Sequence, residues 1–171
     1  EESNKSAMID LPIPALKKRL EMYLQVFAAV VSPRQLFKHN LLYSFYIIMM
    51  SRPEPSISKL SLDCLLSYKS PSVLPYKDRL KRILGDSTFR EEMLNFNVSP
   101  GEGTDIDSST RADAIPMIVY TVFGRFMARA KGAKKGKDTS MARKNAVLQF
   151  LSKLPSEELI WFVHLMFRGI I

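Results

Sequence analysis

The feature that most constrains the fold of this chain is its helical periodicity. Apolar residues recur at spacings of three and four along most of the sequence, as between Leu16 and Val31, and this spacing places them on one face of a helix. No stretch between turn signals alternates apolar and polar residues with a period of two, the pattern of a half-buried strand. Hydrophobic residues make up 46% of the chain, enough for a core. The sequence therefore predicts an all-α protein.

Serine, proline and glycine residues divide this pattern into separate helices. Ser32-Pro33 combines a helix cap with a proline at the first helical position. Pro53 and Pro55 mark a linker, because proline denies a helix its hydrogen bonds. We predict helices over about 15–31, 33–50, 57–68, 72–84, 87–96, 110–130, 139–154 and 155–168. Pro116 lies in the first turns of the sixth of these and predicts either a kink or the true start of that helix.

The turns between these helices are short, which favours antiparallel pairing of neighbours. Each pair spans roughly 40 residues, the size of a HEAT-type unit, and the first two helices are expected to pair across a tight turn. We therefore predict stacked antiparallel helical hairpins, a HEAT-like α-solenoid segment, with a compact helical bundle as the alternative. The chain, 1–171, is expected to be a single helical-repeat segment of a larger protein, with flexible loops at 97–109 and 131–139.

Most of the net charge lies in one stretch, from Arg125 to Lys144. The stretch holds eight basic residues and a single acid, Asp138, so it carries +7 of the chain's +8. A basic tract between amphipathic helices is a candidate site for nucleic-acid phosphates. The candidate binding residues are Arg125, Arg129, Lys131, Lys134, Lys135, Lys137, Arg143 and Lys144.

Other interpretations of this basic stretch stay open at the level of sequence. It is also compatible with a solvated linker between two helices, a contact for an acidic protein or a nuclear import signal. An amphipathic basic helix at its start could bind calmodulin or an anionic membrane, which we rank below nucleic acid. A phosphate-binding loop at Gly132–Thr139 is excluded, because three residues separate its glycines where four are needed and Asp138 replaces the magnesium-binding hydroxyl.

The sequence offers no set of residues for catalysis, a metal or a cofactor. His39 and His164 are far apart and have no ligand spacing with the single cysteine, Cys64. We expect Cys64 to be an inert buried thiol, since it lies on an apolar helical face. The longest apolar run is too short for a membrane span, and one cysteine suits a reducing compartment. Trp161 would indicate a partner contact if exposed and core packing if buried.

Several blocks of sequence, taken in order, resemble the small-subunit processome component 20 family. They are Leu62–Lys69, Val73–Tyr76, Arg111–Asp113 with Pro116, Phe123–Arg125, Val147–Leu151, and Glu157–Leu159 with Phe162, Leu165 and Phe167. The resemblance covers about residues 58–167 and rests on the order and spacing of the blocks. Tyr120 and Gln149 depart from the basic residues that the family pattern leads us to expect, so these two positions are not RNA-binding candidates.

The resemblance implies a non-catalytic scaffold, because that family comprises long HEAT-like solenoids. They act in assembly of the small-ribosomal-subunit precursor and in rRNA processing, in association with the U3 small nucleolar ribonucleoprotein. The expected partners are then pre-ribosomal proteins, with pre-rRNA or small nucleolar RNA at the basic stretch, and no membrane, cofactor or small-molecule substrate. The expected location is the nucleus and nucleolus. A module that binds only proteins, its basic loop contacting an acidic partner or acting as an import signal, is the alternative.

Overall fold

The structure, a computed structural model, describes residues 12–128 and 136–168, with side chains from residue 140 onward in the second range. Within these ranges every regular element is helical, so the predicted all-α class is confirmed. The α-helices are α1 (Ile13–Ala28), α2 (His39–Met50), α3 (Pro55–Ser67), α4 (Lys77–Leu84), α5 (Phe89–Asn95), α6 (Arg111–Met127), α7 (Gly136–Leu151) and α8 (Ser156–Phe167). Short 3-10 turns lie at Pro33–Gln35 and Leu74–Tyr76.

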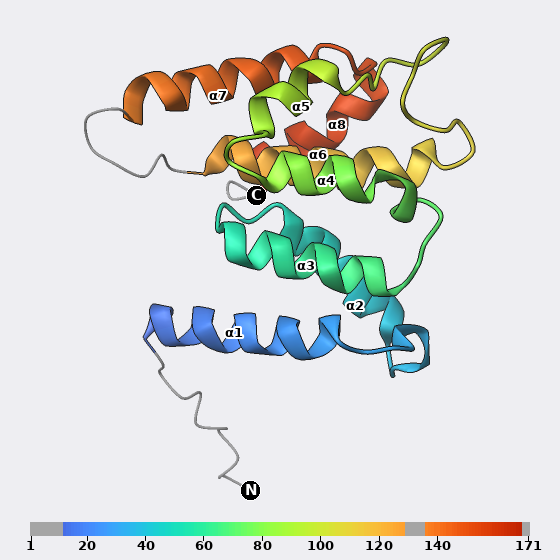
Figure 1. Cartoon of the computed structure of the whole chain (residues 1–171), viewed down its shortest axis with the longest axis vertical. Coiled ribbons are helices and arrows are strands. Elements are labelled where there is room, and N and C mark those ends of the chain that lie inside the picture. The colour runs from blue at the N-terminus through green and yellow to red at the C-terminus, as the bar shows by residue number, and fades with distance from the viewer. Residues whose placement is uncertain (1–11, 129–135, 169–171) are drawn as a thin grey trace, which may run out of the picture.

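The helices are stacked in successive layers, as a solenoid-like segment requires (Figure 1). At one end lies α1, followed by α2 with α3, then by α4 with α6, and finally by α5 and α7, while α8 slopes from this last layer behind α6. The strongest packing joins α1 to α3, α2 to α3 and α6 to α8. The expected pairing of the first two helices is therefore wrong in detail, because α1 packs mainly on α3.

The second predicted helix is divided in two. The sequence predicts one helix from residue 33 to residue 50, but the chain makes only a 3-10 turn at Pro33–Gln35 and Ser32 makes no side-chain capping bond. Leu36 is extended, and Lys38 adopts a left-handed conformation with φ of 54° immediately before α2. Left-handed backbone ends helical propagation. The break exposes the start of α2 on the surface.

The core runs through the stack and contains α6 at its centre. Ala114, Ile115, Met117, Ile118, Val119 and Val122 of this helix are buried. The buried hydroxyl of Thr121 donates to the carbonyl oxygen of Met117 at 2.8 Å, so this polar group is satisfied within its own helix. Pro116 lies inside α6, five residues after Arg111, so it does not mark the start of the helix.

Two of the blocks that carry the resemblance meet in space between α6 and α8. The Nε and Nη2 atoms of Arg111 each donate to a carboxylate oxygen of Glu158 at 2.6 Å. Arg111 Nη2 also donates to the carbonyl oxygen of Val98, at 2.8 Å, and so anchors the loop before α6. Bidentate pairs of this kind fix geometry as well as contributing energy. The Arg111–Glu158 pair thus sets how α8 lies against α6.

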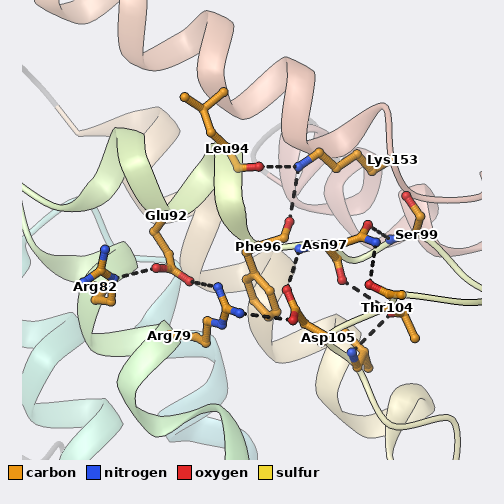
Figure 2. A network of polar contacts seen from close by, with 12 residues as sticks. Arg79, Arg82, Glu92, Leu94, Phe96, Asn97, Ser99, Thr104, Asp105 and Lys153 are labelled. Carbon is orange, nitrogen blue, oxygen red and sulfur yellow. Dashed lines mark hydrogen bonds and ion pairs between the residues drawn. The ribbon is translucent and has the colours of Figure 1, made fainter.

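The loop at 97–109 has no regular structure but is tied at its base (Figure 2). The backbone N–H of Asp105 donates to the carbonyl oxygen of Asn97 at 2.8 Å, and Asn97 N–H donates back to Asp105 Oδ2 at 2.8 Å. Val98 and Ile106 are buried in the core. Of the second predicted loop, 131–139, residues 136–139 belong to α7, and residues 131–135 lie outside the described residues. The flexibility of both loops stays a prediction.

Candidate nucleic-acid interface

The basic stretch joins the end of α6 to the start of α7. Arg125 belongs to the last turns of α6, and Arg143 and Lys144 belong to α7. Lys137 lies in the first turn of α7, and its side chain is outside the described residues, as are Arg129, Lys131, Lys134 and Lys135 entirely. The structure therefore places three of the eight predicted side chains, which have three different environments.

Arg125 is buried, with 4% of its surface exposed. Its Nη2 donates to Asp86 Oδ1 at 2.5 Å, and its guanidinium carbon lies 5.2 Å from the centre of the Phe89 ring. Buried arginines are retained in proteins where a carboxylate and an aromatic face both contact them. Arg125 therefore connects α6 to the segment between α4 and α5, and it does not present its guanidinium to solvent.

Arg143 is half-buried beside Arg125. Its Nη1 donates to the carbonyl oxygen of Ala128 at 3.0 Å, so it links α7 to the end of α6. Burial, and then the charge of Arg125, lower the pKa of Arg143 from its ordinary value, while Asp86 acts in the opposite direction. Asp86 is the anion that offsets this local positive charge. Its hydrogen bond from Arg125 chiefly lowers the pKa of the Asp86 carboxyl, against the opposing effect of burial.

Lys144 is the exposed member of the described three. Its Nζ lies 5.5 Å from the centre of the Phe126 ring, so its ammonium group lies over the α6 side of the joint between α6 and α7. A lysine held over an aromatic ring keeps its ammonium group accessible to an anion. Lys144 is thus the one placed candidate whose geometry suits direct contact with a phosphate.

Lys59 of α3 is a cation near this site that sequence reasoning missed. It is exposed, and its charge contributes to lowering the pKa of Asp86, together with those of Arg125 and Arg143. Nothing local to residue 59 indicates this proximity, because α3 approaches the joint only through the stacking of the layers. The basic surface therefore extends beyond the stretch that the sequence marked.

Other chemical sites find no support in the part of the chain that the structure describes. It holds no group of three or more histidine, cysteine or acidic residues that could bind a metal ion. Cys64 is buried, and burial chiefly raises the pKa of its thiol to about 12, which confirms the predicted inert thiol. Among the described helices, none combines the length and apolarity needed to span a bilayer.

Comparison with known proteins gives one matching family model. The model described as "U3 small nucleolar RNA-associated protein 20, N-terminal" matches residues 14–171. A curated relative of that name from Schizosaccharomyces pombe is 24% identical over 124 residues, which is 72% of this chain. One from Saccharomyces cerevisiae is 25% identical over 130 residues, or 76% of this chain. The chain spans 5% of the length of each relative.

Proposed function

Because the chain belongs to the family of U3 small nucleolar RNA-associated protein 20, N-terminal, we propose that it is a non-catalytic scaffold segment acting in assembly of the small-ribosomal-subunit precursor. The layered helices support this proposal, since stacked helical layers offer long surfaces for partners without requiring a catalytic pocket. The names of the two relatives refer to U3 small nucleolar RNA, which supports association with the U3 small nucleolar ribonucleoprotein and a location in the nucleolus. A role in rRNA processing is part of the same proposal.

We further propose that the joint between α6 and α7 contacts rRNA phosphates. The observation that carries this proposal is the net charge of +7 between residues 125 and 144, together with the exposed ammonium group of Lys144 at that joint. The proposed contacts come from Lys144 and from the lysines at 131, 134, 135 and 137, with Arg129 beside them. Arg143 acts by linking α7 to the end of α6, and Arg125 acts by linking α6 to Asp86 and Phe89. Such binding is electrostatic and tolerant of sequence.

The test is RNA affinity as a function of salt. If about four lysines contact single-stranded phosphates, the logarithm of the affinity falls with the logarithm of salt concentration at a slope of about −3. The variant with Lys131, Lys134, Lys135 and Lys137 changed to Glu should lose most of this affinity and its salt slope. A matched control changes four basic residues outside the stretch to Glu, namely Lys18, Arg19, Lys77 and Lys81, all of which are exposed. Equal loss in both variants would show only a general effect of net charge.

The alternative is a module whose basic stretch contacts an acidic protein or serves for nuclear import. An acidic partner would be displaced by salt as RNA is, so the salt slope alone does not separate the two cases. Crosslinking in nuclear extract separates them, because crosslinks from residues 125–144 to protein alone would favour the alternative. Crosslinks to RNA that disappear in the quadruple lysine variant would favour rRNA contact.

A further inference from the structure

A groove of about 590 Å³ opens at the other end of α6 from the basic stretch. Its walls come from the 3-10 turn at Pro33–Gln35, the start of α2, the segment after α3, the first turns of α6, and α8. Asp113, on its α6 wall, is twelve residues before Arg125, which corresponds to about 18 Å along a helix. The groove is therefore separate from the proposed RNA contact, and its volume is in the range of sites that hold a ligand or a short peptide segment.

Aromatic side chains from two of these walls, α2 and α8, line the groove. Trp161, the single tryptophan of the chain, lines it and is 40% exposed, which meets the condition under which it indicates a partner contact. Tyr43 also lines it and packs edge-on against Tyr68 with ring centres 5.0 Å apart. The Tyr68 hydroxyl donates to the carbonyl oxygen of His39 at 3.0 Å. The Tyr43 and Tyr68 rings are thus already ordered before a ligand binds, which lowers the entropic cost of binding.

Positive charge also lines the groove, next to Tyr68. Arg34 lines the groove, and its Nη2 donates to the carbonyl oxygen of Tyr68 at 3.2 Å, which fixes the guanidinium at the edge. His39 and Asn40 begin α2 there, and the first turn of α2 holds no acidic residue. The amino end of a helix carries partial positive charge that favours an anion. A carboxylate placed at this edge would be attracted both by Arg34 and by the end of α2.

The acidic residue on the α6 wall of the groove indicates a peptide and not a nucleic acid. This residue is Asp113, and its charge would repel the phosphates that accompany every nucleotide. A peptide can satisfy both walls, since an acidic side chain can face Arg34 while a backbone N–H faces Asp113. Tryptophan, tyrosine and arginine, here Trp161, Tyr43 and Arg34, are also the residues that contribute most to affinity at protein interfaces.

We propose that this groove binds an extended segment of a partner protein, with an acidic side chain at Arg34 and the start of α2 and an apolar side chain against Trp161. The proposal takes its biological setting from the scaffold role proposed above, but its geometry does not depend on the basic stretch. The partner is defined by this chemistry, an acidic residue next to an apolar anchor.

The experiment is selection of a random peptide display library on the 171-residue chain, followed by binding of the selected peptides in solution. The expected result is enrichment of sequences that combine an acidic residue with a leucine, phenylalanine or tryptophan nearby. Trp161 reports directly on the groove, so peptides without tryptophan should change its fluorescence as they bind. Enriched peptides that bind without affecting Trp161, or failure to enrich any such sequence, would overturn the proposal.

Three variants locate the binding. Trp161→Ala should weaken binding at least about tenfold, as truncation of a central interface residue does. Arg34→Glu should weaken binding similarly. Arg90→Glu, at an exposed position of α5 away from the groove, makes the same charge change and should have no effect. Asn40→Glu is the decisive variant, because an acid in the first turn of α2 favours the helix while repelling an acidic ligand. Full binding to the Asn40→Glu protein would overturn the assigned position of the carboxylate.

Two further measurements keep this test distinct from that of the RNA contact. The variant with four lysines changed to Glu should bind the selected peptides as the parent does, even where it no longer binds RNA. A single-stranded RNA oligonucleotide should leave Trp161 fluorescence unchanged. Quenching of Trp161 by RNA in competition with the peptides would overturn the peptide assignment and leave the groove as part of an RNA surface.

Discussion

At the scale of single residues, Gly124 allows α6 to cross close to the end of α2. It belongs to Phe123–Arg125, one of the blocks that carry the family resemblance. A Cβ atom built on Gly124 would lie 2.7 Å from the carbonyl oxygen of Met50 and 2.9 Å from that of Arg52. Both neighbours are backbone atoms at the end of α2, so they cannot move aside as a flexible side chain would. The close crossing of α6 over the end of α2 therefore requires glycine. The adjacent Arg125 fixes the same turn of α6 through its ion pair with Asp86.

We predict that Gly124→Ala destabilises the chain by about 1 to 2 kcal/mol. Alanine favours a helix over glycine by up to about 1 kcal/mol, but overpacking against backbone typically costs about 1 to 3 kcal/mol and prevails here. Urea unfolding followed by circular dichroism measures the difference. The control is Asn145→Ala, at an exposed position of α7, which should not lower the free energy of unfolding. A stabilised Gly124→Ala protein would contradict the close crossing.

At the scale of elements, charge holds the short helix α5 in place (Figure 2). Glu92 of α5 is 2% exposed and accepts hydrogen bonds from Arg79 Nη1 at 3.0 Å and Arg82 Nε at 2.6 Å, both from α4. At the other end of α5, Lys153 Nζ donates to carbonyl oxygens of Met93, Leu94 and Phe96 at 3.2 to 3.3 Å. A lysine at this position also interacts favourably with the helix dipole. These contacts suit a helix of seven residues, which is too short to be stable alone.

We predict that removing Arg79 and Arg82 lowers the free energy of unfolding more than removing the charge of Glu92 does. Changing both Arg79 and Arg82 to Met leaves a buried carboxylate without its partners, which should cost about 3 kcal/mol or more. Glu92→Gln should cost only about 1 kcal/mol, because the side chains of both arginines are more than a third exposed to water. Each arginine also keeps an acidic neighbour, Asp105 for Arg79 and Glu91 for Arg82. Combining all three changes should recover part of the loss. Denaturant unfolding of the three proteins gives this order directly, and equal losses would contradict it.

The helices were predictable from sequence because their signals are local. Apolar spacing and Glu157 in the first turn of α8 act within a few residues of where they stand. Pro55 was assigned to a linker but is the first residue of α3, because proline is tolerated at the first helical position. The break before α2 was not predictable, since Lys38 carries no residue-type signal for a left-handed conformation. The pairing of α1 with α3 was also missed, because it depends on contacts between residues far apart in sequence.

The candidate site was predictable only as a concentration of charge. Sequence marks Arg125 and Lys144 equally, yet one is buried and the other exposed. The difference is made by Asp86, which is 39 residues from Arg125 in the chain and reaches it only in the folded stack. The same holds for the groove, since Arg34, Asp113 and Trp161 come from three distant segments. Each of these residues shows its environment only when the layers are assembled.

At the scale of the whole molecule, α1 at one end of the stack and α8 on the side of α6 expose apolar surface (Figure 1). Ile13, Met22 and Val26 of α1 are 57% to 82% exposed, while Leu20 and Phe27 of the same helix pack against the core. On α8, apolar residues are exposed at Ile160, Val163, Met166 and Phe167. In a helical solenoid each layer buries the face of the next, so the exposed face of α1, at one end of the stack, is of the kind on which another layer or copy can pack. Contiguous apolar surface in water promotes association.

We predict that the 171-residue chain therefore self-associates with increasing concentration. Met22→Lys combined with Val26→Lys should suppress this association and leave the thermal unfolding temperature nearly unchanged, because both side chains point away from the core. The control adds the same charge without removing apolar surface, through Gln25→Lys and Asn145→Lys at exposed polar positions. Sedimentation velocity over a range of concentrations compares the three proteins. Association that persists in the double lysine variant but disappears when Val163 and Phe167 are changed to Lys would assign it to α8. A parent chain that stays monomeric throughout would contradict the packing role of the exposed α1 face.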